Sequence, residues 1–322
     1  MRKCDACGVR PASVYQAHTG RKLCRECFLA DVEARVVSEV KRWGMIRPSD
    51  RIVLGLSGGK DSYVMLDILA RIHDPGRLIG VSIVEGIPGY NREKHIHEIK
   101  KHARQLGVDV VFTSIREYTG YSLYEIVSRA RRRGSRHAAC TYCGISRRRI
   151  LQAYARMLGA DKVATAHNLD DEVQTALVNI MRGDVVGLLR QHPLSPPASS
   201  GIIPRIKPLR KIYEWETATY NMLKGYPFQD TECMFINLQP TLRARVREEL
   251  YRLEDREPGI ALRILETLDT LLEEKARSLK PEELPRCARC GEPTSTGRTI
   301  CKLCELLEDA GIVKPVYSVA NP

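Results

Sequence analysis

Residues 52–62 read IVLGLSGGKDS, and this stretch decides the fold. An apolar run comes first, two adjacent glycines follow, and a lysine, an aspartate and a serine begin the next segment. Adjacent glycines remove Cβ atoms where a backbone has to approach a ligand closely. Free N–H groups at the start of a helix attract anions, and the helix dipole adds to this attraction. The stretch therefore predicts a buried strand, a phosphate-binding turn and a helix start.

The turn differs from a Walker A loop, which needs Gly-x-x-x-x-Gly-Lys followed by Ser or Thr. This loop is shorter, and Asp61 stands where Walker A carries its hydroxyl. The plain alternative is a tight strand-to-helix turn with an ordinary N-terminal cap. The complete run from Ser57 to Ser62 after the first strand of an α/β domain favours phosphate binding.

Strand and helix patterns alternate around this stretch from Arg51 to about Ile203. Predicted strands are 52–56, 78–84, 108–114 and 162–166, and predicted helices are 62–72, 92–106, 145–158 and 170–181. Strands separated by helices form βαβ units, which place parallel strands in one sheet. The fold class predicted is α/β, with a doubly wound parallel sheet covered by helices on both faces.

The flanking segments predict smaller units. An amphipathic helix is expected at 29–43, a Pro- and Ser-rich loop at 192–201, and further helices at 214–224 and 241–280, broken at Pro258-Gly259. The predicted division is 1–28 as an N-terminal knuckle, 29–240 as the main domain, 241–286 as a helical extension, and 287–322 as a C-terminal knuckle with a tail of about a dozen residues.

Composition narrows the class of protein. The chain has 322 residues, of which 43% are hydrophobic, without an apolar run long enough to span a membrane. Its first residues lack the apolar core of a secretory signal, so we expect a cytoplasmic protein without membrane attachment. The formal net charge is +12. Such an excess favours a polyanionic partner such as nucleic acid, and the alternative is a thermophile's charged surface.

Eight of the eleven cysteines form two groups of paired CxxC motifs. The first group is Cys4, Cys7, Cys24 and Cys27, and the second is Cys287, Cys290, Cys301 and Cys304. Both groups have the spacing of tetrahedral Cys₄ zinc sites, so two Zn²⁺ ions are predicted. Disulfides, which occur inside some hyperthermophile cells, are the alternative.

Three cysteines remain, at Cys140, Cys143 and Cys233. A CxxC pair with one distant cysteine is a ligand short for closed zinc, and it suits a [4Fe–4S] cluster with one open iron. Alternatively, Cys140 and Cys233 cycle through persulfide and disulfide. A structural CxxC with an unrelated core cysteine is the third reading.

Three segments resemble the PP-loop ATP pyrophosphatases, which split ATP between its α- and β-phosphates and adenylate a carbonyl oxygen. The first is SGGKDS at 57–62, the second is AHNLDDE at 166–172, similar to the tRNA-thiolating branch, and the third is SIVEGIPGY at 82–90. The resemblance implies ATP with Mg²⁺, and catalytic roles for Asp61, Asp171, Cys140 and Cys233. The ATP-binding residues that it implies are Leu56, Ser57, Gly58, Gly59, Lys60, Asp61, Ser62, Ser82, Ile83, Ala166, His167 and Asp171.

Cys140, Cys143 and Cys233 also resemble the tRNA-thiolating branch, because PP-loop thiouridine synthetases carry a CxxC motif and a later cysteine in the same order. Residues 129–149 bracket the CxxC pair and hold eight arginines without an acid. A charge run is usually a solvated face, but here a phosphate-tracking role is favoured. The expected tRNA-binding residues are Arg131, Arg132, Arg133, Arg136, Arg147, Arg148 and Arg149, with a weaker patch at Arg243, Arg245 and Arg247.

The resemblance implies ATP-dependent 2-thiolation of a tRNA uridine, and features such as Met181-Arg182-Gly183-Asp184 favour position 34. The alternatives are uridine or 5-methyluridine 54 of the T-loop, cytidine 32, an amidotransferase-type or NAD-synthetase-type PP-loop ligase, and a zinc-ribbon RNA-binding adaptor without catalysis. The sulfur donor is either free sulfide or a ubiquitin-like carrier with a thiocarboxylate. Relatives of this kind suggest a homodimer.

Overall fold

The computed structural model describes residues 2–90, 92–197, 201–228, 231, 233–235, 241–281 and 283–313, with the backbone alone at 92–94. Residues 198–200 of the predicted loop and the predicted tail from 314 onward lie outside the described residues.

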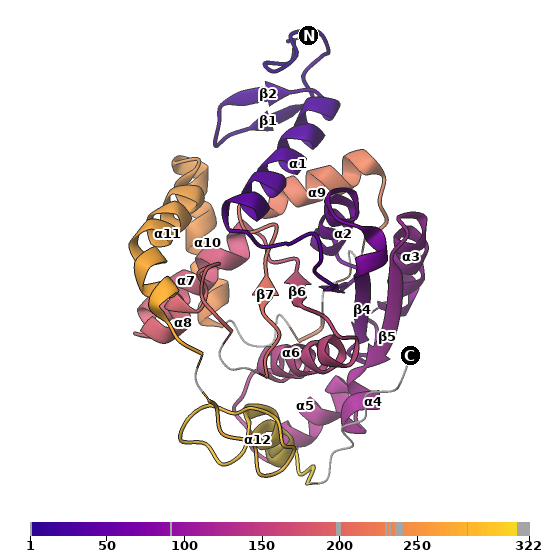
Figure 1. Cartoon of the computed structure of the whole chain (residues 1–322), viewed down its shortest axis with the longest axis vertical. Helices are drawn as coiled ribbons and strands as arrows, with labels where there is room; N and C mark the ends of the chain where they lie inside the picture. Colours follow the sequence, from indigo (N-terminus) through magenta and orange to yellow (C-terminus); the bar gives the residue numbers. More distant parts are fainter. Residues whose placement is uncertain are drawn as a thin grey trace.

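A five-stranded parallel sheet forms the centre of the molecule (Figure 1). Its strands are β3 (Ile52–Gly55), β4 (Leu78–Val84), β5 (Asp109–Ser114), β6 (Lys162–Thr165) and β7 (Arg205–Ile206). They lie in the order β5-β4-β3-β6-β7, and every neighbouring pair is parallel. The chain builds outward from β3 on one side and then on the other, so the winding reverses between β3 and β6. The predicted doubly wound α/β fold is confirmed.

The strands form because their apolar runs are buried on both faces, as parallel sheets require. Ile52 and Leu54 of β3 pack into one core, and Val53 between them packs into the other. Three of the four predicted strands are one residue too long at one end. The fifth strand, β7, was not predicted because its two residues carry no periodic signal, and its pairing of Arg205 with Val163 is a long-range contact.

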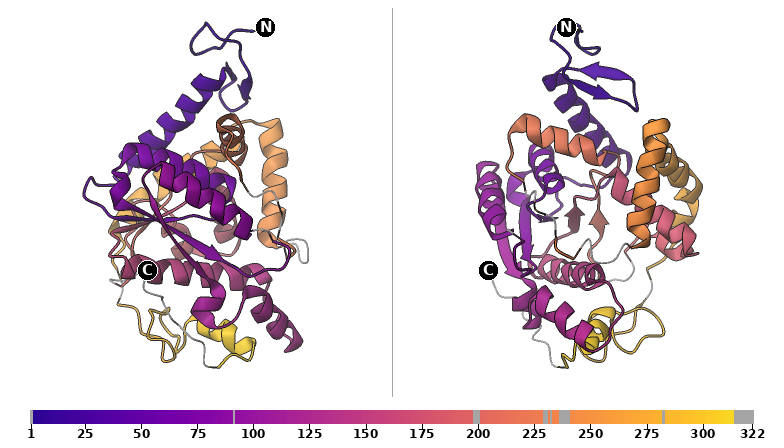
Figure 2. Two further views of the ribbon diagram at one scale, coloured as in Figure 1. Left: turned by 90° about the vertical axis from the view of Figure 1, so that its right-hand side faces the viewer. Right: turned by 180° about the vertical axis from the view of Figure 1, so that it is seen from behind.

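Helices cover both faces (Figure 2). The first core contains residues of α1 (Arg25–Arg42), α2 (Lys60–Ile72), α3 (Arg92–Gln105) and α9 (Glu214–Lys224). The second core contains residues of α4 (Ile115–Thr119), α5 (Leu123–Arg132), α6 (Ala139–Met157) and α12 (Lys302–Asp309). A single 3-10 turn, η1 (Pro75–Arg77), leads into β4. Within the described residues, no helix has both the length and the apolar character needed to cross a bilayer.

A third group of helices packs beside the sheet. It consists of α7 (Leu169–Met181), α10 (Leu242–Arg256) and α11 (Ile260–Ser278), which share a small core, and of α8 (Val185–Leu189), which contacts α7 and α11. Buried Arg210 joins this group to α1, because its guanidinium donates to Asp269 at 2.6 and 2.8 Å and to Glu39 at 2.7 Å. Removing one member of such a buried group costs about 3–5 kcal/mol of folding free energy.

The two knuckles lie at opposite ends of the molecule (Figure 1). The N-terminal knuckle contains the hairpin β1 (Val14–Gln16) and β2 (Arg21–Leu23), and it leads directly into α1. Buried Gln16 donates to Glu216 of α9 at 3.1 Å, and Arg35 of α1 pairs with the same carboxylate. The C-terminal knuckle packs through α12 against α5 and α6. Both knuckles are therefore docked onto the sheet domain.

Four helices begin earlier than predicted: α2 and α7 by one or two residues, and α1 and α6 by more. α1 begins at Arg25 rather than at residue 29, directly after Cys24. α6 begins at Ala139 rather than at residue 145, so the whole CxxC pair lies in its first turns. Gly144 weakens this part of the helix, because glycine loses more conformational freedom on folding than other residues do. Burial of Tyr142 in the second core offsets that cost and extends the helix toward its N-terminus.

Candidate active site

The phosphate loop lies between the end of β3 and the start of α2, at the edge of the sheet where the winding reverses. Gly58 has φ +76°, a conformation that L side chains rarely adopt, which explains the glycine. Gly59 is the N-cap of α2, and no side chain caps the first turn. Ser62 N–H donates to Gly59 O at 3.0 Å, whereas the N–H groups of Lys60 and Asp61 have no partner among the described residues and are available to an anion, as the sequence predicts.

The remaining loop residues hold the turn in shape. Buried Leu56 packs into the first core, the hydroxyl of Ser57 accepts from Gly59 N–H at 3.3 Å, and Ser62 Oγ donates to Gly59 O at 2.7 Å. Ser57 is partly exposed, so its hydroxyl can also reach a ligand.

Helix α9 holds the two charged residues of the loop, a contact that the sequence did not predict. The hydroxyl of Thr217 donates to Asp61 Oδ1 at 2.5 Å, and Glu214 accepts from Lys60 Nζ at 2.9 Å. The amide of Asn221 donates to Lys60 O at 2.9 Å. Because Thr217 and Asn221 are fully buried, these contacts restrict where Asp61 and Lys60 can point.

The segment after β6 meets the loop from the other side. Ala166 packs against the first core, and His167 Nδ1 lies 2.9 Å from Thr165 Oγ1. Asn168 caps α7 by a reciprocal pair of hydrogen bonds with Asp171, and its side chain also donates to Asp61 at 3.3 Å. Burial, followed by the positive charges around it, lowers the pKa of His167 to about 3, so its imidazole is neutral at physiological pH.

Carboxylates gather where the two segments meet. Burial raises the pKa of Asp170 to about 6, although Glu214 N–H donates to its carboxylate at 2.7 Å. Burial also raises the pKa of Asp171, and the nearby charge of Asp61 adds to that rise against the opposing effect of Arg243. Like charges in this crowded position favour a bound cation, which would relieve their repulsion.

Helix α10 closes this side of the site. Arg243 pairs with Asp171 and donates to Gln174 at 3.1 Å. Arg247 lies 3.5 Å from the carboxylate of Glu214. The hydroxyl of Tyr251 donates to the same carboxylate at 2.6 Å. Two arginines of the weaker predicted RNA patch are thus paired with carboxylates of the candidate site.

The strand end that resembles an adenine wall is largely core. Ser82 is 1% exposed and Ile83 is 6% exposed, and Ile83 packs into the second core. Their side chains are therefore occupied by packing, and the backbone of β4 is the part that a purine could approach. Glu85, also buried, lies 3.6 Å from Arg147 of α6.

Cys140 and Cys143 lie in the first turns of α6, and Cys233 lies in a short described segment that packs against the second core. Cys140 is exposed on the first turn of α6, whereas Cys143 and Cys233 both pack against the second core. Phe235, two residues after Cys233, stacks on Tyr124 and lies under Arg131 of α5. The segment that carries Cys233 therefore lies on the same face of the sheet as the CxxC pair.

Among the described residues, the sulfurs of Cys140, Cys143 and Cys233 do not all lie within 4.8 Å of one another. Ligands of one zinc ion must meet that limit, since Zn–S bonds are about 2.3 Å long. Ligands of an iron–sulfur cluster bind different irons and lie further apart, so the limit does not test a cluster. The assignment of Cys140, Cys143 and Cys233 stays a prediction.

The knuckle cysteines do meet in space. In each knuckle, the four ligand atoms lie within 4.8 Å of one another. In the C-terminal knuckle, the Cys287 and Cys304 sulfurs are 3.7 Å apart, and the Cys290 and Cys301 sulfurs are 3.6 Å apart. Four sulfurs around one zinc would be separated by about 3.8 Å, the edge of a tetrahedron with 2.3 Å bonds. The spacing therefore fits a tetrahedral metal ion.

Comparison with known proteins identifies the central domain. The family model of the PP-loop domain matches residues 31–254. The chain belongs to the PP-loop family. A second model, the N-terminal LIM domain of the 2-thiouridine synthetase TtuA, matches residues 3–29, which cover the first knuckle.

Several relatives resemble this PP-loop protein over nearly its whole length. It is 35% identical to the tRNA 2-thiolation protein NcsA of Haloferax volcanii, over 95% of this chain and 98% of that protein. It is 31% identical to cytoplasmic tRNA 2-thiolation protein 1 of Danio rerio, over 95% and 88%. It also resembles the solved structure of the U34-tRNA thiolase NcsA from Methanococcus maripaludis with its [4Fe-4S] cluster, with a TM-score of 0.77 and 28% identity over 96% of each chain.

The arginine-rich stretch of this PP-loop protein divides into two parts. Arg131, Arg132 and Arg136 are exposed, as is Arg133, whose Nε donates to Asp309 O at 3.2 Å. On α6, Arg147 and Arg149 instead pair with Glu85 and Glu292. Arg148 is exposed and has no hydrogen-bond or ion-pair partner among the described residues. A role of these residues in RNA binding stays a prediction.

We expect anaerobically purified PP-loop protein to contain two zinc ions per chain, one in each knuckle. The reason is that both sets of four sulfurs already lie at the separation that a tetrahedral ion requires. Elemental analysis of the wild type, of Cys24→Ser and of Cys301→Ser measures this, and each variant should lose about one ion. Fewer than one zinc per wild-type chain, with the eight thiols found as disulfides, would contradict the assignment.

Proposed function

We propose that this protein is an ATP-dependent tRNA 2-thiolation enzyme acting on uridine 34. ATP adenylates the C2 oxygen of the uridine and pyrophosphate leaves. A sulfur nucleophile then attacks C2, and AMP departs with the former oxygen. The observation that carries the proposal is the likeness over 96% of both chains to a U34-tRNA thiolase.

The site supports the first half of this reaction. The uncapped first turn of α2 would bind the phosphates of ATP through its N–H groups, with Lys60 beside them. Asp61 and Asp171, whose charges repel each other, would hold Mg²⁺, a cation that prefers carboxylate oxygens. Neutral His167 cannot add a positive charge at physiological pH, so it would donate or accept a hydrogen bond.

The second half requires sulfur beside the activated carbon, which we assign to Cys140, Cys143 and Cys233. They would hold an iron–sulfur cluster, which supplies an open iron able to carry sulfide. The position of both Cys143 and Cys233 against the second core is compatible with this assignment. The donor would be free sulfide or the thiocarboxylate of a ubiquitin-like carrier.

We further propose that residues 1–28, 29–240, 241–286 and 287–322 act as knuckle, catalytic domain, helical tRNA-binding extension and second knuckle. The enzyme would work in the cytoplasm as a homodimer. The intact phosphate loop argues against a non-catalytic RNA-binding adaptor, because an adaptor has no need of a nucleotide site.

The test is mass spectrometry of tRNA from a strain that lacks this gene, together with thiolation by the purified protein. We expect 2-thiouridine to disappear from position 34 and the purified protein to restore it with ATP and a sulfur source. Loss of the thionucleoside at uridine 54 or cytidine 32 would show that this nucleotide, rather than uridine 34, is the substrate. Absence of any thionucleoside change, without pyrophosphate release on mixing with ATP and tRNA, would refute the function.

A further inference from the structure

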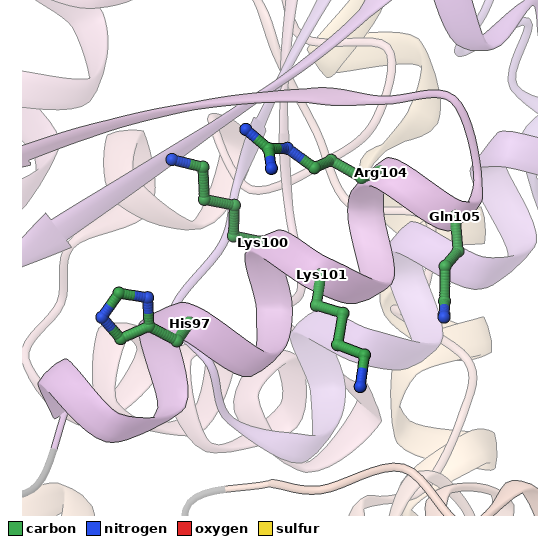
Figure 3. Close-up of a pocket in the computed structure, with 5 residues that line it drawn as sticks. All are labelled: His97, Lys100, Lys101, Arg104 and Gln105. Carbon is green, nitrogen blue, oxygen red and sulfur yellow. The ribbon is translucent and has the colours of Figure 1, made fainter.

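Helix α3 carries a strongly basic face outside the candidate active site. His97, Lys100, Lys101, Arg104 and Gln105 line a shallow hollow of about 430 Å³ (Figure 3). Lys100 and Arg104 point to one side of the helix, and Lys101 and Gln105 point to the other. Among the residues whose side chains the structure describes, no acidic or apolar one lines this hollow. We call these five residues the α3 face.

The cations of the α3 face form no ion pair with a described carboxylate. Elsewhere on the surface, exposed arginines such as Arg2, Arg116 and Arg298 pair with a neighbouring carboxylate. Within the part of the chain that the structure describes, Lys101 and Arg104 form no ion pair, and Lys100 contacts only the ring of Phe112, 5.2 Å from its centre. Three positive charges therefore remain available on one helix.

One described acid of this helix, Glu98, lies near these cations. It forms no ion pair with a described residue, and its charge also acts on Tyr63 of α2. Burial, followed by that charge, raises the pKa of Tyr63. One carboxylate beside three cations leaves a net positive charge. The α3 face thus keeps a local positive potential, which draws in polyanions.

The face is continuous with the candidate active site. The first turn of α3 touches the phosphate loop, since a Cβ at Gly58 would lie 3.4 Å from His95 Cβ. At 1.5 Å per residue, the helix carries the charges over about 15 Å from His95 to Gln105. A polymer whose reacting base lies at the loop can therefore reach the α3 face with its neighbouring residues.

We propose that the α3 face binds the phosphate backbone of the tRNA substrate. This inference rests on the proposed function and adds a contact surface to it. A protein partner would need apolar or aromatic anchors at the centre of its interface, and the described residues that line the hollow include none. Phosphates need only cations and hydrogen-bond donors, which are what these five side chains supply. From Lys100 to Arg104 the charges lie close enough to contact successive phosphates.

The test compares tRNA binding by wild type and by the Lys100→Ala/Lys101→Ala/Arg104→Ala variant over a series of salt concentrations. Each lost phosphate contact should lower the slope of log K against log salt by about 0.7–0.9. We expect the slope to fall by about two and the affinity at about 0.1 M salt to fall at least tenfold. ATP affinity and zinc content should not change, because these side chains touch neither site.

The matched control is Arg2→Ala/Arg116→Ala/Arg298→Ala, which removes the same charge from arginines that have carboxylate partners. A slope and affinity for the α3 variant equal to those of this control would overturn the inference. Unchanged tRNA binding with impaired thiolation from a carrier protein would assign the face to that carrier and also overturn it. If the wild type itself neither bound nor thiolated tRNA, the proposed function would fail instead.

Discussion

Asp61→Ala should reduce tRNA-dependent pyrophosphate release by at least about a hundredfold, the usual effect of removing one group that stabilises transition-state charge. Asp61 lies in the first turn of α2, and its carboxylate is 23% exposed, so part of it can reach Mg²⁺ or the phosphates. Ser57→Ala should also impair the reaction, because the hydroxyl is partly exposed on the same turn. Single-turnover pyrophosphate release with saturating ATP and tRNA measures both effects.

Asp61 also joins α9, so the experiment has to separate its charge from its packing. Asp61→Asn keeps an oxygen that can accept from Thr217, and it loses the charge. Thr217→Val keeps the charge and removes the hydrogen bond, which contributes about 1.5–3 kcal/mol when its acceptor is charged. We expect Asp61→Asn to be as inactive as Asp61→Ala, and Thr217→Val to lose about tenfold to a hundredfold.

The control for these variants is Asp74→Ala, which removes an exposed carboxylate at the start of η1, away from the loop. It should behave as wild type. Near-wild-type pyrophosphate release by Asp61→Ala and Ser57→Ala together would remove the phosphate-loop assignment. Activity retained by Asp61→Asn alone would leave Asp61 a purely structural role through Thr217 and Asn168.

The second large effect concerns the three cysteines near α6. Each of Cys140→Ala, Cys143→Ala and Cys233→Ala should abolish thiolation while leaving adenylation intact, since sulfur delivery follows activation of the uridine. Anaerobic reconstitution with iron and sulfide should give the wild type the broad visible absorption of an iron–sulfur cluster. Iron content, absorption and thionucleoside yield are measured on the same samples.

The rival mechanism gives a different pattern. If Cys140 and Cys233 alternate between persulfide and disulfide, Cys143→Ala remains active while the other two variants are inactive. Thr141→Ala, between the two cysteines of the same turn, is the matched control and should be fully active. A wild-type protein that gains no absorption, and whose iron-free form thiolates tRNA at full rate, would exclude the cluster.

Local patterns in the sequence were sufficient for much of the fold and site. The apolar runs of β3 and β4 predict strands that are buried on both faces. The helical periodicity of the segments between the strands predicts the alternation of strand and helix. The phosphate-binding turn can be predicted from its glycines, because the backbone at Gly58 has a positive φ that other residues rarely adopt. In the knuckles, two cysteines separated by two residues can reach one ion without any help from distant segments.

Contacts between distant segments were not predictable in the same way. The sequence indicates that α9 is a helix, but not that Thr217 and Glu214 hold residues of the phosphate loop. Strand β7 was not predicted, because two residues are too few to show a periodic pattern of apolar side chains. Helical patterns tell which face of a helix is apolar, and they do not tell which neighbour that face will meet.

The arginine-rich stretch shows the division between the two sources of information. The sequence by itself determined that residues 129–149 are basic and surround a CxxC pair. Only the tertiary structure decided that Arg147 and Arg149 are paired with Glu85 and Glu292, and that a further group of cations without ion pairs to described residues lies on α3. Residue spacing along the chain sets the chemistry available within a few turns. Whether a charge is neutralised depends on which remote carboxylate the packed core brings within a few ångström, and that depends on the fold as a whole.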